Sequence, residues 1–139
     1  MKYAKHEKAG DFCQGCKDRL TEGDPALDEW FWHMKRFYPD LHCSWVWRSK
    51  SDQDNFFAAG NSLQRWPDSP HNAMKQGVPC ARAIDVFQQD PKGRAIFSSQ
   101  FCFMINEASK REGYSLFWGG AWRSIHDYNH FQLDALKQK

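Results

Sequence analysis

The sequence predicts an α+β fold in which helices flank a small, largely antiparallel sheet. Apolar residues recur at helical spacing in two long stretches, 23–40 and 93–113. Short stretches with strand character lie between and after these helices, at 42–49, 81–88, 114–118 and 129–133. A mixed order of this kind is typical of α+β domains.

The first helix has both of its ends marked in the sequence. Asp24 is a suitable N-cap, Pro25 occupies the first helical position, and Pro39 stops the helix. One face of the helix would be apolar, and it would carry Leu27, Trp30, Phe31, Met34 and Phe37. We expect this face to pack in the core.

The next stretch, "HCSWVWRS" at 42–49, alternates as a strand does, so Arg48 would emerge at its C-terminal end. The alternation would place three side chains on one face, those of Cys43, Trp45 and Trp47. A short helix with a serine cap follows at 49–60 and ends at Gly60. The loop at 61–80 contains several Pro and Gly residues, and we expect it to be functional because compact domains seldom keep loops of this length.

The second half of the chain alternates strand, helix and two short strands. "ARAIDVFQ" at 81–88 reads as a strand, and a glycine turn at 119–120 separates the two short strands that close the chain. The helix predicted at 93–113 would have one apolar face, formed by Phe97, Phe101, Met104, Ile105 and Ala108.

Length and charge narrow the class of protein. The 139 residues suit one domain spanning 1–139, with a polar N-terminal segment at 1–23. The net charge of +2 is too small and too scattered to indicate a nucleic-acid partner. No stretch approaches the roughly 18 apolar residues of a membrane span, and the start lacks the apolar region of a signal peptide. We therefore expect a protein made in the cytoplasm, without membrane insertion, and a monomer by default.

Five cysteines form an odd set, which argues against a disulfide framework. Cys13 and Cys16 form a lone C-x-x-C, whose ordinary interpretation is a reduced turn. An auxiliary metal or redox role for this pair stays open, as does a zinc-ribbon-like or nucleic-acid-binding protein centred on it. Three other histidines are expected to be ordinary surface or core residues without a functional role, namely His6, His33 and His42.

Most of the remaining candidate ligands occur in three short segments, "SPH" at 69–71, "ARAIDVF" at 81–87 and "HDYNH" at 126–130. Two imidazoles and one carboxylate, from His71, Asp85 and His130, would form a three-ligand zinc site. A fourth position left open for water is typical of catalytic rather than structural zinc. Cys80 is the other potential ligand in this region, but Asp85 lies on the alternating strand and is preferred.

Two further residues would complete a hydrolytic site. Asp127 lies three positions before His130, close enough to take a proton from zinc-activated water and deliver it to a leaving amine. Arg48, at the end of a separate strand, would stabilise an oxyanion or hold the substrate carbonyl. Together these residues form the parts of a zinc amidohydrolase.

The same segments resemble the zinc D-Ala-D-Ala carboxypeptidase and L-alanyl-D-glutamate endopeptidase family, which includes phage endolysins and vancomycin-resistance type D,D-peptidases. That family shows S-x-H, then A-x-D, then a Trp-rich segment ending in D/E-x-x-H; here these are 69–71, 83–85 and 127–130. The resemblance implies a Hedgehog/D-Ala-D-Ala-peptidase-like fold and one Zn²⁺ on His71, Asp85 and His130. It also implies that Asp127 is the catalytic acid and base.

An upstream element of the family is matched by Arg48-Ser49 and Gln53, which implies that Arg48 stabilises the substrate or the transition state. One departure concerns the loop between His71 and Asp85, which is longer than is usual in the family. The residues expected to meet the substrate are Ser69, Gln53, Trp118, Trp122 and His126. For Trp66, Trp118 and Trp122 a cleft wall and plain core packing both stay open.

The resemblance implies hydrolysis of a peptide bond in the stem peptide of bacterial peptidoglycan. The bond expected to be cleaved is the L-Ala-D-Glu bond, as in phage endolysins of the L-alanyl-D-glutamate endopeptidase type. Such an enzyme accumulates in the host cytoplasm and acts on the cell wall after release. A D-Ala-D-Ala carboxypeptidase or dipeptidase is one alternative. A non-catalytic, zinc-stabilised wall-binding module is another, although such a module has no need of Asp127.

Overall fold

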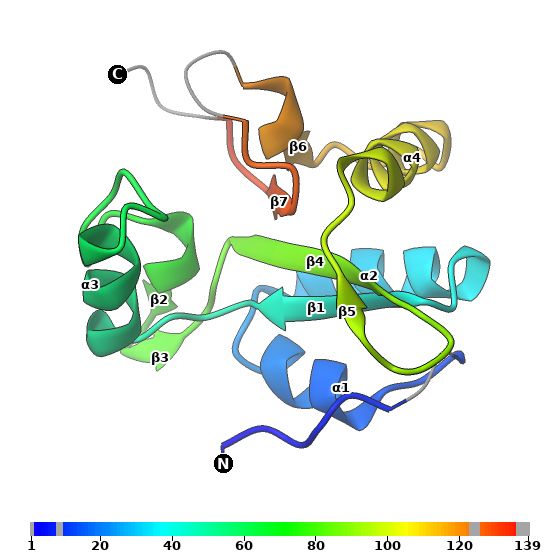
Figure 1. Cartoon of the computed structure of the whole chain (residues 1–139). Coiled ribbons are helices and arrows are strands. Elements are labelled where there is room, and N and C mark those ends of the chain that lie inside the picture. The colour runs from blue at the N-terminus through cyan, green and yellow to red at the C-terminus, as the bar shows by residue number, and fades with distance from the viewer. Residues whose placement is uncertain (1, 8–9, 123–125, 136–139) are drawn as a thin grey trace.

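The computed structural model describes residues 2–7, 10–122 and 126–135, and it confirms a mixed α+β architecture (Figure 1). Four helices are formed by α1 (Gln14–Leu20), α2 (Pro25–Phe37), α3 (Lys50–Ala58) and α4 (Ser99–Arg111). The strands are β1 (Leu41–Trp45), β2 (Met74–Lys75), β3 (Val78–Pro79), β4 (Ala83–Gln89), β5 (Ala95–Ile96), β6 (Phe117–Trp118) and β7 (His130–Gln132). Two 3-10 turns, η1 (Pro70–Asn72) and η2 (Gly119–Ala121), complete the described elements.

The main sheet is antiparallel and runs in the order β1-β4-β7-β6, with β5 pairing to β4. Strand β4 is central because it pairs with β1 on one side and β7 on the other. The register of β4 and β7 places Asp85 opposite His130, so two of the predicted ligands meet across one strand pair. β2 and β3 form a separate hairpin.

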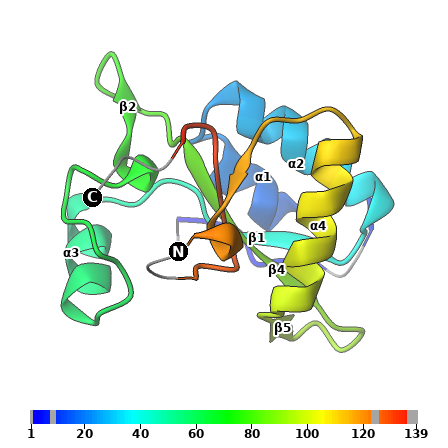
Figure 2. The same ribbon diagram turned by 90° about the horizontal axis from the view of Figure 1, so that it is seen from above.

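The helices lie on different sides of this sheet. In Figure 1, α1 lies below the sheet and α4 above it, while α3 and the β2–β3 hairpin stand together at one end. Figure 2 shows α2 and α4 side by side, which agrees with the contacts between them. None of the helices in the described part of the chain is both long enough and apolar enough to cross a membrane.

Helix α2 begins as predicted, because the side chain of Asp24 accepts a hydrogen bond from the Ala26 N–H and Pro25 is the first helical residue. The helix ends at Phe37, which is 58% exposed, so this residue does not belong to the buried face as predicted. The other four predicted residues are fully buried in the core: Leu27, Trp30, Phe31 and Met34.

Two predicted elements have different bounds in the structure. The strand predicted at 42–49 ends at Trp45 after a register shift, so Val46 is buried while Trp45 and Trp47 are half-buried. The helix predicted at 93–113 begins only at Ser99, because Ser98 caps it and the residues before it pair with β4 as β5. Phe97 therefore lies outside α4 and is exposed, and Met104, within α4, is exposed rather than buried as predicted.

Two regions contain more structure than the sequence predicted. The stretch 1–23, predicted to be polar, holds α1 and buries Cys13, Cys16 and Leu20 in the core, so it is not simply polar. The 61–80 loop contains η1 and the β2–β3 hairpin. Strands of two residues carry too little periodicity to be recognised from sequence.

Candidate active site

The three predicted ligands, His71, Asp85 and His130, meet in the structure. His71 Nε2 lies 3.2 Å from His130 Nδ1 and 3.3 Å from Asp85 Oδ1, and His130 Nδ1 lies 3.1 Å from the same oxygen. All three residues are buried. They come from η1, β4 and β7, and β4 pairs with β7 and also contacts η1.

These separations fit a tetrahedral metal ion. Zinc binds nitrogen and carboxylate oxygen at about 2.0–2.1 Å, so two ligand atoms of a tetrahedron lie about 3.3 Å apart. The observed separations of 3.1–3.3 Å match that edge length for all three pairs. Two imidazoles and one carboxylate are also a donor set typical of catalytic zinc.

Hydrogen bonds behind the two imidazoles fix which nitrogen faces inward. The Nδ1 of His71 lies 2.7 Å from the Val46 carbonyl, which only accepts, so this nitrogen carries the hydrogen. His130 Nε2 lies 2.7 Å from Gln132 Oε1, and the amide of Gln132 is oriented because its Nε2 donates to the Asp134 carbonyl at 2.6 Å. Both inward nitrogens therefore present lone pairs when the imidazoles are neutral.

Three acceptors that face one another require a positive centre. Burial alone would lower the pKa of His130, but the hydrogen bond and charge of Asp85 raise it, so a proton on Nδ1 can fill this role. Burial lowers the pKa of His71 and favours its neutral form. Burial would raise the pKa of Asp85, but His71 and His130 hold it well below its ordinary value. A divalent cation would compete for the same position as the proton.

Arg48 supports Asp85 from behind. Its Nη2 donates to Asp85 Oδ2 at 2.7 Å, and its Nη1 donates to Gln53 Oε1 at 3.3 Å. The guanidinium also lies over the ring of Phe56, 4.0 Å from its centroid. Gln53 is held in turn, because its Nε2 donates to the carbonyl of Gln64 at 2.8 Å. Gln53 thus positions Arg48 in this structure and is itself fully buried.

The turn that carries His71 is capped on both sides. Ser69 Oγ accepts from the His71 N–H at 3.2 Å, and Asn72 Oδ1 accepts from the Ser69 N–H at 3.1 Å. The Asn72 side chain also donates to the carbonyl of Arg48 at 3.1 Å, and the Arg48 N–H donates to the His71 carbonyl at 2.9 Å. Ser69 therefore orients His71, and the turn is tied to the segment that bears Arg48.

Asp127 lies beside the ligand group and lines a pocket. Its Oδ2 lies 3.9 Å from His130 Nδ1, and its side chain is 44% exposed. Burial, and then the charge of Asp85, raise the pKa of Asp127. The pocket encloses about 310 Å³, and residues lining it include Arg48, Ser69, His71, Trp122, Asp127 and His130.

The fold of the chain has a counterpart among solved structures. The chain shares its fold with an endopeptidase. The crystal structure of the L-Ala D-Glu endopeptidase ChiX of Serratia marcescens superimposes with a TM-score of 0.67 at 23% sequence identity, over 86% of each chain. No family model matches the sequence, and no curated protein matches it either. The likeness to ChiX establishes the fold.

The aromatic residues predicted to meet the substrate lie in different places. The Trp122 ring lies 5.1 Å from that of His130 and lines the pocket. Trp118 donates through Nε1 to the Tyr128 carbonyl at 2.7 Å and stacks on Phe131, outside the described lining of the pocket. His126 is exposed and stacks on Tyr128, with its Nδ1 3.1 Å from the Gly120 carbonyl.

Sequence reasoning missed two supporting residues and one ligand group. Gln132 follows His130 by two positions on a strand, a spacing that signals a shared face. Asn72 carried no such signal, because its role depends on the turn geometry. The second ligand group lies apart from the pocket and consists of His6, Cys13, Cys16 and His42. Only its C-x-x-C was visible in the sequence.

Proposed function

We propose that the protein is a zinc-dependent peptidase that cleaves the L-Ala-D-Glu bond in the stem peptide of bacterial peptidoglycan. One observation carries the proposal. His71, Asp85 and His130 direct three acceptor atoms toward one point at tetrahedral spacing, beside a pocket that Asp127 borders. The fold shared with an L-Ala D-Glu endopeptidase supports the choice of bond.

The residues divide into ligands and groups that move or hold charge. His71, Asp85 and His130 would hold the zinc ion, which when bound would polarise a peptide carbonyl and acidify water. Val46 and Gln132 keep the imidazoles in the orientation that binding requires. Arg48 donates a hydrogen bond to one oxygen of Asp85, so its first role would be to orient this ligand of the metal. Arg48 also lines the pocket, where it could contact an oxygen of the substrate.

Asp127 is the proposed proton carrier. An aspartate side chain is ordinarily ionised at neutral pH. Burial and the charge of Asp85 raise the pKa of Asp127, which brings its proton affinity closer to the range in which a general base works. Its position beside His130 and its half-exposed side chain allow contact with both water and a leaving amine. On the substrate side, Trp122 would form one wall of the pocket. Direct substrate contacts of Ser69, Gln53, Trp118 and His126 remain predictions from the sequence.

The test is digestion of purified peptidoglycan by the zinc-loaded protein, followed by mass spectrometry of the released muropeptides. Cleavage next to D-Glu, with a new L-Ala carboxyl terminus, is the expected result. Loss of terminal D-Ala alone would instead indicate the D,D-carboxypeptidase alternative. No cleavage by fully loaded protein would contradict a peptidase and favour a wall-binding module.

The Asp127→Asn variant separates proton transfer from metal binding. We expect it to keep its zinc and to lose at least about 100-fold in turnover, the usual scale for a general base. Asp11→Asn is a matched control because Asp11 is an exposed carboxylate that does not line the active-site pocket. Unchanged turnover in Asp127→Asn would remove the proposed role.

A further inference from the structure

The second ligand group is built from three separate segments of the chain. His6 lies on the N-terminal segment at 2–7, Cys13 and Cys16 lie at the start of α1, and His42 lies on β1. One ligand atom of each residue lies within 4.8 Å of all the others. Cys13, Cys16 and His42 are fully buried. The segments approach one another only in the folded chain.

The distances within this group fit a closed metal site. His6 Nδ1 lies 3.5 Å from the sulfurs of both Cys13 and Cys16, and His42 Nδ1 lies 3.5 Å from the sulfur of Cys16. Zinc binds sulfur at about 2.3 Å and nitrogen at about 2.0–2.1 Å, so a tetrahedron places sulfur and nitrogen about 3.6 Å apart. Three independent pairs therefore show the spacing that a bound ion requires.

Backbone amides support both sulfurs. The Glu7 N–H donates to the sulfur of Cys13 at 3.4 Å, and the Cys43 N–H donates to that of Cys16 at 3.4 Å. A neutral thiol is a weak acceptor, whereas a thiolate accepts strongly, so these donors favour the metal-bound form. Lys35 is fully buried, and its ammonium donates only to two carbonyls among the described residues. Burial lowers the pKa of Lys35, and negative charge on Cys16 and Cys13 opposes that shift.

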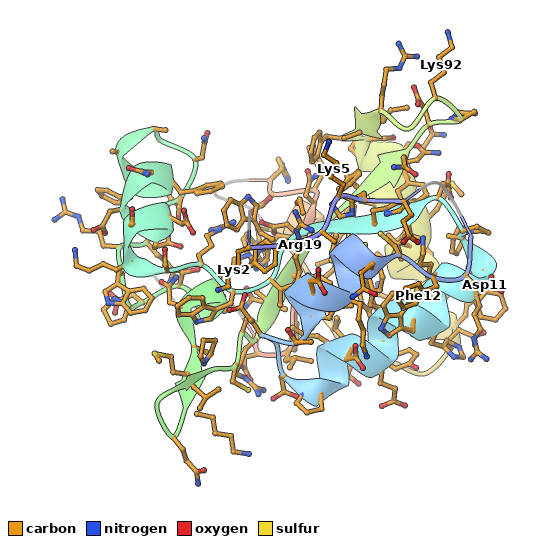
Figure 3. All side chains as sticks on the ribbon, turned by 90° about the horizontal axis from the view of Figure 1, so that it is seen from below. Lys2, Lys5, Asp11, Phe12, Arg19 and Lys92 are labelled. Atoms are coloured by element: carbon orange, nitrogen blue, oxygen red, sulfur yellow. The ribbon has the colours of Figure 1, made fainter. Side chains whose placement is uncertain are left out.

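The N-terminal segment packs closely enough on α1 to hold its ligand in place. A Cβ added to Gly15 would lie 2.7 Å from the Ala4 carbonyl oxygen and 2.8 Å from that of Lys5. Figure 3 shows this segment, with Lys2 and Lys5, running alongside α1, which carries Arg19. On the other side, Phe87 packs against the rings of His6 and His42.

We propose that His6, Cys13, Cys16 and His42 form a second, structural zinc site that ties the N-terminal segment to α1 and β1. Four protein ligands of the Cys2His2 type close the coordination sphere, as structural zinc sites require. Two thiolates balance the charge of the ion, two protons are released on binding, and no oxidant takes part. The proposal is independent of the peptidase activity, because none of these four ligands lines the active-site pocket.

Metal analysis of the full-length protein tests the proposal directly. We expect two equivalents of zinc per chain. Protein loaded with cobalt should show an intense thiolate-to-cobalt charge-transfer absorption, which the nitrogen and oxygen ligands of the active site cannot produce. A wild-type protein that binds only one equivalent, without the thiolate band, would overturn the second site.

Variants assign each equivalent to its site. Cys16→Ala should lose the thiolate band and one equivalent, whereas Cys102→Ala is a matched control because Cys102 is also buried but lies outside both groups. His71→Ala should lose the other equivalent and keep the band. Loss of the band in His71→Ala, or its retention in Cys16→Ala, would contradict the assignment. Failure of the peptidase proposal would leave the thiolate band, and its loss in Cys16→Ala, unchanged.

Two further variants, at the contact between the N-terminal segment and α1, test the second zinc site if Cys16→Ala does not fold. His6→Ala removes the ligand that is only partly buried, and Gly15→Ala displaces the segment without removing a ligand. We expect each to weaken zinc binding at this site more than about tenfold, the lower scale for losing a supporting group. Unchanged affinity in His6→Ala would remove this residue from the site and overturn the proposal.

Discussion

Arg48 and Asp85 form a buried pair in which the guanidinium binds only one of the two carboxylate oxygens. Arg48 Nη2 donates to Asp85 Oδ2 at 2.7 Å, while Oδ1 faces His71 and His130 at 3.3 and 3.1 Å. The arginine therefore leaves one oxygen for a metal and fixes its direction. The stability of the proposed zinc site depends on this division between the two oxygens.

Replacing Arg48 should weaken zinc binding as well as turnover. Arg48→Ala leaves Asp85 Oδ2 without its donor, so the carboxylate can rotate away from the imidazoles, and we expect zinc affinity to fall by about 10–100-fold. Arg48→Lys should recover part of this loss, because one donor remains. Competition with a chromogenic chelator measures the affinity. Affinity unchanged in Arg48→Ala would show that the arginine serves substrate alone.

Gln132 should control the same site through His130. Gln132→Leu removes the acceptor that holds the His130 Nε2 hydrogen, and we expect a loss of about 10–100-fold in zinc affinity. Gln132→Glu keeps an acceptor of the same reach and serves as the matched control. The same chelator titration measures both variants, and equal losses in the two would show that the hydrogen bond is not the cause.

Gly119 should position Asp127 without touching a ligand. A Cβ at Gly119 would overlap the carbonyl oxygen of Asp127 and lie 3.0 Å from its Cβ, so Gly119→Ala must move that residue. We expect zinc to be retained and turnover to fall by at least about tenfold, because displacement of a reacting group is costly. Ala121→Gly changes the same turn without adding an atom and should have a smaller effect. Turnover and zinc content are measured on the same preparation.

The hydrogen bond between Trp30 and Ser109 should contribute to stability. Trp30 Nε1 donates to Ser109 Oγ at 2.9 Å, and both residues are buried. Ser109→Ala leaves the indole N–H unpaired, so the free energy of unfolding should fall by about 1–3 kcal/mol. Urea denaturation measures it. The exposed Ser115→Ala is the control, and an equal change in both variants would argue against the hydrogen bond.

Local signals in the sequence predicted a large part of the fold. Helix α2 was predicted with its cap and its first residue because Asp24 and Pro25 act on their immediate neighbours. The late start of α4 was not predicted, since β5 forms only by pairing with β4, and that pairing competes with helix extension. The early end of β1 depends likewise on a register shift against β4.

The sequence by itself was enough to predict the residues of the candidate site: His71, Asp85 and His130 as candidate ligands, and Asp127 beside them. Only the tertiary structure decided which atoms of these residues face inward. The carbonyl of Val46 and the amide of Gln132 set the inward nitrogens, and Arg48 sets the inward oxygen. The group around Cys13 and Cys16 likewise exists only after folding, because His6 and His42 reach it from segments that pack together in three dimensions. Motifs record residue types, whereas the direction of a lone pair depends on the partners that folding supplies.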